Sequence, residues 1–187
     1  MGNWYINAVV KDKSRELIAA YLRQTKWRSA VLPSAGRYTT VGLEFEDFPE
    51  PHSLPDWSAR LSKELSCPLL TTVNVSDDML YFYLCDRGRL AAEYFSSDAY
   101  EVAPQLPSTG NNNQIAKALC DFTEGGDVAA VEKILSSHGK YLFAVELHLE
   151  LAEAMRLRAP SIGVGYKYAT KGELPEGVKL EDLILTP

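Results

Sequence analysis

The sequence predicts an α+β fold, with a ferredoxin-like βαββαβ core, a sheet extended by a hairpin, and a C-terminal helical subdomain. From residue 3 to residue 75 the expected elements run strand, helix, strand, strand, helix, strand, which is the order of the split βαβ arrangement. The stretch Leu69–Phe95 then contains three runs rich in β-branched, aromatic and apolar residues. Two short polar breaks separate these runs, as in an antiparallel meander.

The elements before the meander follow from periodicity. Asn3–Val10 alternates between two faces, which predicts a strand, and the apolar residues of Arg15–Thr25 recur at helical spacing. We expect further strands over Ser29–Leu32 and Tyr38–Glu46. A proline-rich connection follows, and a second helix ends near Ser66.

A change of composition divides the chain. Residues 96–113 contain two prolines, a glycine and a run of three asparagines, which is typical of a linker. We therefore predict a sheet domain over 1–98, a linker over 99–112 and a helical subdomain over 113–187. We expect the helical subdomain to pack on the sheet.

The C-terminal part is predicted to contain three helices, of which Asn113 caps the first and Asp127 the second. The third covers Lys140–Arg158 and is followed by Pro160, which cannot continue a helix. We expect Ser161–Thr170 to form a short strand and 172–187 to form an extended tail.

The composition indicates a soluble cytoplasmic protein. The chain has 187 residues, of which 46% are hydrophobic, and no apolar run approaches the roughly 20 residues that span a bilayer. Because the N-terminus passes directly into an alternating run, we expect no secretory signal and no membrane contact. Cys67, Cys85 and Cys120 are widely spaced, which favours neither a disulfide framework nor a zinc site.

Charge is distributed unevenly along the chain. The net charge of −6 disfavours nucleic acid as a partner. Residues 1–40 nevertheless hold seven basic and two acidic residues, whereas the rest of the chain holds 12 basic and 23 acidic ones. This pattern indicates either a basic helix packed beside an acidic body or a basic face for an anionic partner.

Candidate site residues are the acidic residues in the breaks of the meander and one histidine in the third predicted helix. Asp77 and Asp78 occupy the first break, where carboxylates can hold Mg²⁺ or Ca²⁺ but also favour turns. No calcium-loop spacing is present, so we favour turns and predict neither a metal nor a cofactor. His148 shares a helix face with apolar residues, which indicates either a buried, hydrogen-bonded histidine or a general base.

Tyrosines suggest a binding surface on the sheet. Tyr81, Tyr83 and Tyr94 offer large contact area with polar tips, which suits recognition, although strand propensity alone also explains them. Both faces of Met79–Cys85 are apolar or aromatic. The strand is therefore expected to be covered on both sides unless a groove remains.

No stretch matches a specific catalytic motif. We therefore favour a non-enzymatic binding or regulatory protein that acts through protein–protein contact, and an immunity-type role is compatible with a small acidic α+β protein. The alternative is a small hydrolase or transferase with an acidic, metal-assisted site that uses Asp77, Asp78 and His148.

The segment from Val75 to Ser97 resembles the hairpin of an uncharacterised bacterial protein family. In that family an acid-capped strand and a short turn with glycine precede a strand that ends in Glu-Tyr-x-Ser, here Glu93 to Ser96. The segment Gly163–Tyr168 after the long helix is similar too, and the resemblance covers about a third of the chain. It implies a bacterial cytoplasmic origin and carries over no activity, catalytic residue or cofactor.

Overall fold

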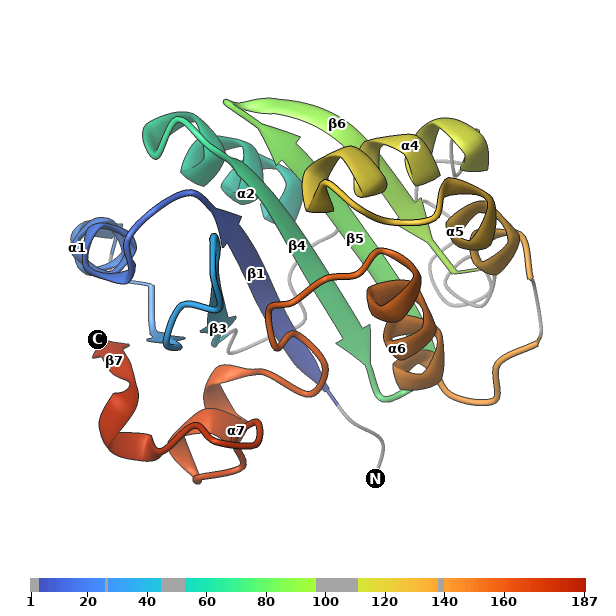
Figure 1. The fold of residues 1–187 in the computed structure, drawn as a ribbon. Coiled ribbons are helices and arrows are strands. Elements are labelled where there is room, and N and C mark those ends of the chain that lie inside the picture. Colours follow the sequence, from blue (N-terminus) through green and yellow to red (C-terminus); the bar gives the residue numbers. More distant parts are fainter. Residues whose placement is uncertain (1–3, 26, 45–52, 97–110, 138–139) are drawn as a thin grey trace.

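The computed structural model describes residues 4–25, 27–44, 53–96, 111–137 and 140–187, and its architecture is α+β (Figure 1). Within these residues, seven strands form one antiparallel sheet in the order β6-β5-β4-β1-β3-β2-β7. None of the described helices has the length and apolar content needed to cross a bilayer. The strands are β1 (Tyr5–Lys11), β2 (Ser29–Val31), β3 (Tyr38–Leu43), β4 (Pro68–Val75), β5 (Met79–Asp86), β6 (Arg89–Phe95) and β7 (Ile184–Thr186). The helices are α1 (Arg15–Thr25), α2 (Ser53–Glu64), α4 (Asn112–Thr123), α5 (Val128–Leu135), α6 (Ala144–Ala154), α7 (Tyr166–Thr170) and the 3₁₀ turn Leu180–Asp182.

Helices α1 and α2 cover one face of the sheet. Alternate residues of β1, such as Ile6, Ala8 and Val10, point to this face because successive side chains of a strand point to opposite sides. They form a core with the apolar stripes of the two helices, including Leu22 and Trp57. This arrangement of two helices on one face agrees with the element order that the sequence predicts.

The other face has two covers. Helices α4, α5 and α6 lie over β4, β5 and β6, where Leu80 and Phe82 join their core (Figure 1). Helix α7 contacts β2 and β3 instead, with Tyr166 and Ala169 packed near Ala30. The expectation that Met79–Cys85 is covered on both sides is confirmed.

Two tight turns build the meander. Ser76 and Asp77, between β4 and β5, have φ values of 55° and 63°. Arg87 and Gly88, between β5 and β6, have φ values of 47° and 86°, and two-residue hairpin loops of this left-handed kind match the twist of the strands. The strand ends are therefore set by local turn chemistry.

The C-terminal part differs from the expectation in four places. Helix α6 is shorter than 140–158, because the chain leaves the helix at Arg156, which has a φ of 54°. The strand expected over 161–170 is instead a turn followed by α7, since β7 occupies the sheet edge beside β2. The tail therefore contributes a strand that periodicity did not indicate. The cap of α4 is Asn111, and the linker expected over 99–112 lies, up to residue 110, outside the described residues.

Candidate functional site

The three tyrosines of the expected binding surface are buried. Tyr81 and Tyr83 are 2% and 1% exposed and belong to the core beneath α2, where they contact Phe95. Tyr94 is 3% exposed and lies on the opposite face, against Phe82. Because they occupy two different cores, these tyrosines do not form a common surface.

His148 lies in a buried hydrogen-bond chain. Its Nδ1 is 2.7 Å from the Tyr5 hydroxyl, and its Nε2 is 3.2 Å from the Ser161 hydroxyl. Burial lowers the pKa of His148 to about 4 and raises that of Tyr5 to about 12, so the histidine is neutral and the tyrosine protonated near pH 7. The Asn7 side chain extends the chain by donating to the Ser161 and Val164 carbonyl oxygens.

In this hydrogen-bond chain, the Ser161 hydroxyl lies beside the His148 ring, and the Tyr5 hydroxyl orients that ring from the other side. A nucleophilic catalyst has the same order of groups: nucleophile, base and orienting group. A nucleophile must also meet its substrate, and Ser161, His148 and Tyr5 are 0%, 4% and 2% exposed. The adjoining cavity has about 20 Å³ of space, enough for roughly one water molecule. This row of hydrogen bonds therefore joins β1, α6 and the segment before α7. Its side chains are closed to substrate.

Asp77 and Asp78 are turn residues. The Asp77 N–H donates to the Asn74 side chain, whose amide donates back to the Asp77 carboxylate at 3.2 Å. The Asp77 carbonyl accepts from the Ala144 N–H at the start of α6, yet neither aspartate lines the cavity beside His148. Among the described residues, no three acidic, histidine or cysteine side chains are gathered as a metal site would require. The cavity beside His148 therefore does not bring together the three residues of the hydrolase alternative.

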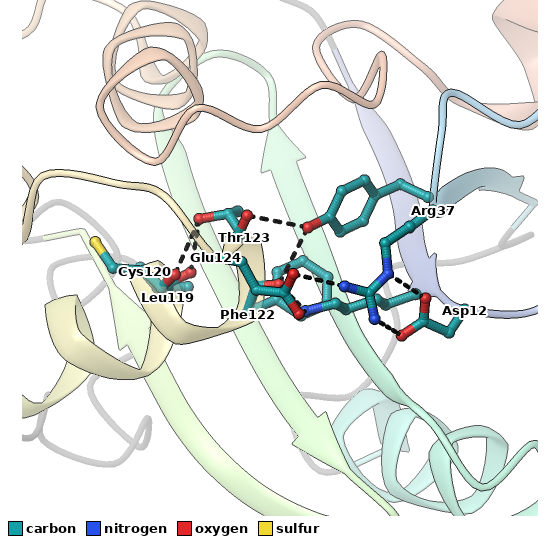
Figure 2. A network of polar contacts seen from close by, with 9 residues as sticks. Asp12, Arg37, Leu119, Cys120, Phe122, Thr123 and Glu124 are labelled. Atoms are coloured by element: carbon teal, nitrogen blue, oxygen red, sulfur yellow. Dashed lines mark hydrogen bonds and ion pairs between the residues drawn. The ribbon is translucent and has the colours of Figure 1, made fainter.

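A charged network lies at the end of β1, where α4 meets the sheet (Figure 2). Lys11 Nζ donates to the Phe122 carbonyl and to Glu124 Oε1, each at 2.7 Å. Arg37 donates to both oxygens of Asp12, at 2.5 and 2.6 Å, and to Glu124 Oε2 at 2.5 Å. Glu124 therefore bridges two cations, Lys11 at the end of β1 and Arg37 in the turn before β3.

Each group in this network stabilises the charge of another. Hydrogen bonding to Arg37 lowers the pKa of Asp12, and hydrogen bonding to Lys11 lowers that of Glu124. The same contacts, first among them Asp12, raise the pKa of Arg37. Lys11 is only 5% exposed, and its ammonium lies 5.8 Å from the centre of the Phe122 ring. A buried ammonium needs such partners.

Two chain reversals bring two further arginines, Arg156 and Arg158, close to this network. Glu124 ends α4 with a φ of 58°, and Arg156 follows α6 with a φ of 54°. The Asp127 N–H donates to the Ala154 carbonyl and ties the two helix ends together. A side chain on Gly126 would meet Cys120 Sγ at 2.6 Å, so only glycine permits this close approach.

The result is a pocket of about 350 Å³ that contains three arginines, Arg37, Arg156 and Arg158. Its other lining residues are Ala35, Gly36, Tyr38, Thr123, Glu124 and Gly125. The Tyr38 hydroxyl donates to the Phe122 and Thr123 carbonyls at the end of α4, where the last carbonyls of a helix have no partner within the helix (Figure 2). This pocket is far larger than the cavity beside His148 and opens to solvent through exposed arginines.

The pocket is locally positive. Lys11 and the three arginines carry four positive charges, against which Asp12 and Glu124 set two negative ones. Helices α4 and α6 both end here, and each C-terminus adds roughly half a negative charge. A surplus of about one positive charge remains in a chain of net charge −6.

Comparison with protein-family models, curated sequences and solved structures gives no match. The resemblance of the hairpin to an uncharacterised bacterial family therefore stays a prediction.

Sequence reasoning found only part of this pocket. The excess of basic residues in 1–40, which include Lys11 and Arg37, indicated either a basic helix packed beside an acidic body or a basic face for an anionic partner. Arg156 and Arg158 were assigned to the end of a helix and had no indicated role. Their place in the pocket depends on where α6 ends and on the close approach of the two helix ends at Gly126, and neither shows in the pattern of charges.

Proposed function

We propose that this protein is a non-enzymatic binding protein that recognises an anionic group of a partner protein in the pocket of Arg37, Arg156 and Arg158. The observation that carries the proposal is the presence of three guanidinium groups on one pocket. Arginine suits this task because its planar fork matches carboxylate and phosphate oxygens.

The ion pairs of the three arginines leave two of their guanidinium groups available to a ligand. Arg37 is held by Asp12 and Glu124, so it is oriented before any ligand arrives. Within the described residues, Arg156 and Arg158 have no ion-pair partner and both are exposed. Two arginines remain for a ligand, beside a third that is already positioned.

The same reasoning favours a protein partner over nucleic acid. A polyanion would approach a chain of net charge −6, whereas a single anionic group meets only the positive pocket. An immunity-type role, in which a small acidic protein sequesters another protein, agrees with this charge layout.

We also propose a finer fold class and a cellular location. The order β4-β1-β3-β2, with α1 and α2 on one face, supports a ferredoxin-like core to which three further strands are added. A cytoplasmic location is supported by Cys67, Cys85 and Cys120, which are free and buried.

Thermal unfolding with multivalent anions tests the proposed function. A ligand at ten times its Kd stabilises by about 1.4 kcal/mol, which raises the Tm of a chain of this length by about 3–6 °C. We expect citrate or sulfate to raise the Tm beyond chloride at equal ionic strength, and R156Q/R158Q to reduce the difference to the general stabilisation that these excluded anions give any protein.

The matched control is R23Q/R89Q, which removes two exposed arginines outside the pocket and the same charge. It should keep the response of the unchanged protein. Equal responses of the two double variants would contradict the proposal, since they would show screening of net charge alone.

A further inference from the structure

The three arginines reach the pocket from two separate segments. Arg37 comes from the turn before β3, and Arg156 and Arg158 come from the segment after α6, with Thr123–Gly125 between them. A single guanidinium can bind both oxygens of a planar carboxylate, as the fork of Arg37 on Asp12 illustrates. The pocket therefore offers more donors than one carboxylate can accept.

A phosphate monoester supplies the negative charge and the hydrogen-bond acceptors that would match the donors of this pocket. It carries about −1.5 to −2 charges near pH 7 and three terminal oxygens. The two arginines without ion-pair partners supply two charges, and each guanidinium has several N–H donors. We propose that the pocket binds a phosphate monoester, an inference that rests on the proposed function and names its ligand class.

The size and lining of the pocket support this ligand class. A pocket of about 350 Å³ is at the lower end of the range for small-molecule sites, so it holds more than a bare anion. Tyr38 and Gly36 line the remaining space, and no heavy atom lies within 4 Å of where a Gly36 side chain would begin. The group that carries the phosphate occupies this side of the pocket.

Glu124 opposes binding. Its carboxylate lines the pocket while it bridges Lys11 and Arg37, so any bound anion approaches a fixed negative charge. The Coulomb energy is proportional to the charge of the ligand, so a dianion is attracted more strongly by Arg156 and Arg158 than a monoanion is, and it is also repelled more strongly by Glu124. E124Q should therefore tighten binding of both anions.

Calorimetric titration with phenyl phosphate, phenyl sulfate and malonate tests the inference. The phosphate ester is expected to bind at least about tenfold more tightly than the sulfate ester, and R156Q or R158Q should each weaken it about tenfold or more. Since the second pKa of a phosphate ester is about 6, its affinity should fall on going from pH 7.5 to 5, whereas that of the sulfate ester should not.

The outcomes separate the inference from the proposed function. Malonate or sulfate binding that depends on the arginines, at an affinity equal to that of the phosphate ester, overturns the phosphate assignment and leaves an anion-binding protein. Absence of binding by all three probes overturns both, and the arginines then serve only the ends of α4 and α6.

The source of the phosphate is resolved by two further probes. Glycerol phosphate represents a free small molecule, and a neutral peptide with one phosphoserine represents a modified partner protein. Tighter binding of the peptide, lost on dephosphorylation and in R158Q, supports a phosphorylated partner. Tighter binding of glycerol phosphate assigns a small-molecule ligand and contradicts the protein partner.

Discussion

The buried His148 should make the stability of this protein fall as the pH is lowered. Burial holds its pKa at about 4 in the folded chain, against an ordinary value of about 6.5 in the unfolded chain. Between these two pKa values, His148 therefore binds a proton in the unfolded state and stays neutral in the folded state. The histidine's contribution is fully present above pH 6.5 and is lost as the pH falls towards 4.

The magnitude follows from the two pKa values. One pKa unit corresponds to about 1.36 kcal/mol, so the free energy of unfolding should fall by about 2 kcal/mol at pH 5 and about 3 kcal/mol at pH 4. The shift is supported by the geometry, because Tyr5 and Ser161 are neutral partners and His148 is 4% exposed. Among the described residues, both side chains that hydrogen-bond the imidazole are hydroxyls, so neither supplies a negative charge to an imidazolium.

Urea unfolding from pH 8 to pH 4 measures this effect. Carboxylates titrate over part of the same range, so the quantity of interest is the difference between the unchanged protein and H148Q. That difference should shrink by about 2 kcal/mol between pH 7 and pH 5. S161A keeps the histidine and should retain the full slope. Parallel pH profiles for the unchanged protein and H148Q would refute the reasoning.

Three further predictions concern stability and are checked by urea unfolding at pH 7. The Tyr81 hydroxyl is buried and has no hydrogen-bond partner within the described residues, so Y81F should be neutral or stabilising by up to about 1 kcal/mol; Y94F, which loses a bond to the Leu135 carbonyl, should destabilise instead. A side chain on Gly42 would meet the Gly165 backbone at 2.9 Å, so G42A should cost about 1–3 kcal/mol, whereas G125A, with a nearest atom at 3.9 Å, should cost less. K11M removes the ammonium that holds Phe122 and Glu124 and should cost about 1–3 kcal/mol; an unchanged stability would show that the network contributes nothing.

The sheet and its two faces could be predicted because they depend on local periodicity. The alternation in β1 and in Met79–Cys85 divides each strand into two faces, and turn residues such as Asp77 and Gly88 mark the strand ends. The same alternation explains why Tyr81 and Tyr83 are buried, since both faces of their strand were apolar or aromatic.

The C-terminal part could not be predicted because long-range contacts decide it. Tyr166 and Tyr168 alternate as in a strand, but the backbone of Gly165 packs against Tyr5 and the sheet edge beside β2 is taken by β7. Local pattern alone does not reveal which segment reaches an edge.

The pocket could not be predicted for the same reason. Arg37 lies in the first quarter of the chain and Arg158 in the last, and a charge pattern does not show that two helix ends meet. The excess of basic residues in 1–40 left open whether these residues pack beside an acidic body or face an anionic partner, and it did not indicate where they gather.

Chemical-shift mapping during a titration with phenyl phosphate tests the central claim most directly. The arginine-lined pocket predicts saturable shifts in backbone amides of 35–38, 123–125 and 156–158, together with shifts of the Arg156 and Arg158 side-chain N–H groups. These shifts should be absent in R156Q/R158Q. Shifts that do not saturate, or that centre on other residues, would contradict the account.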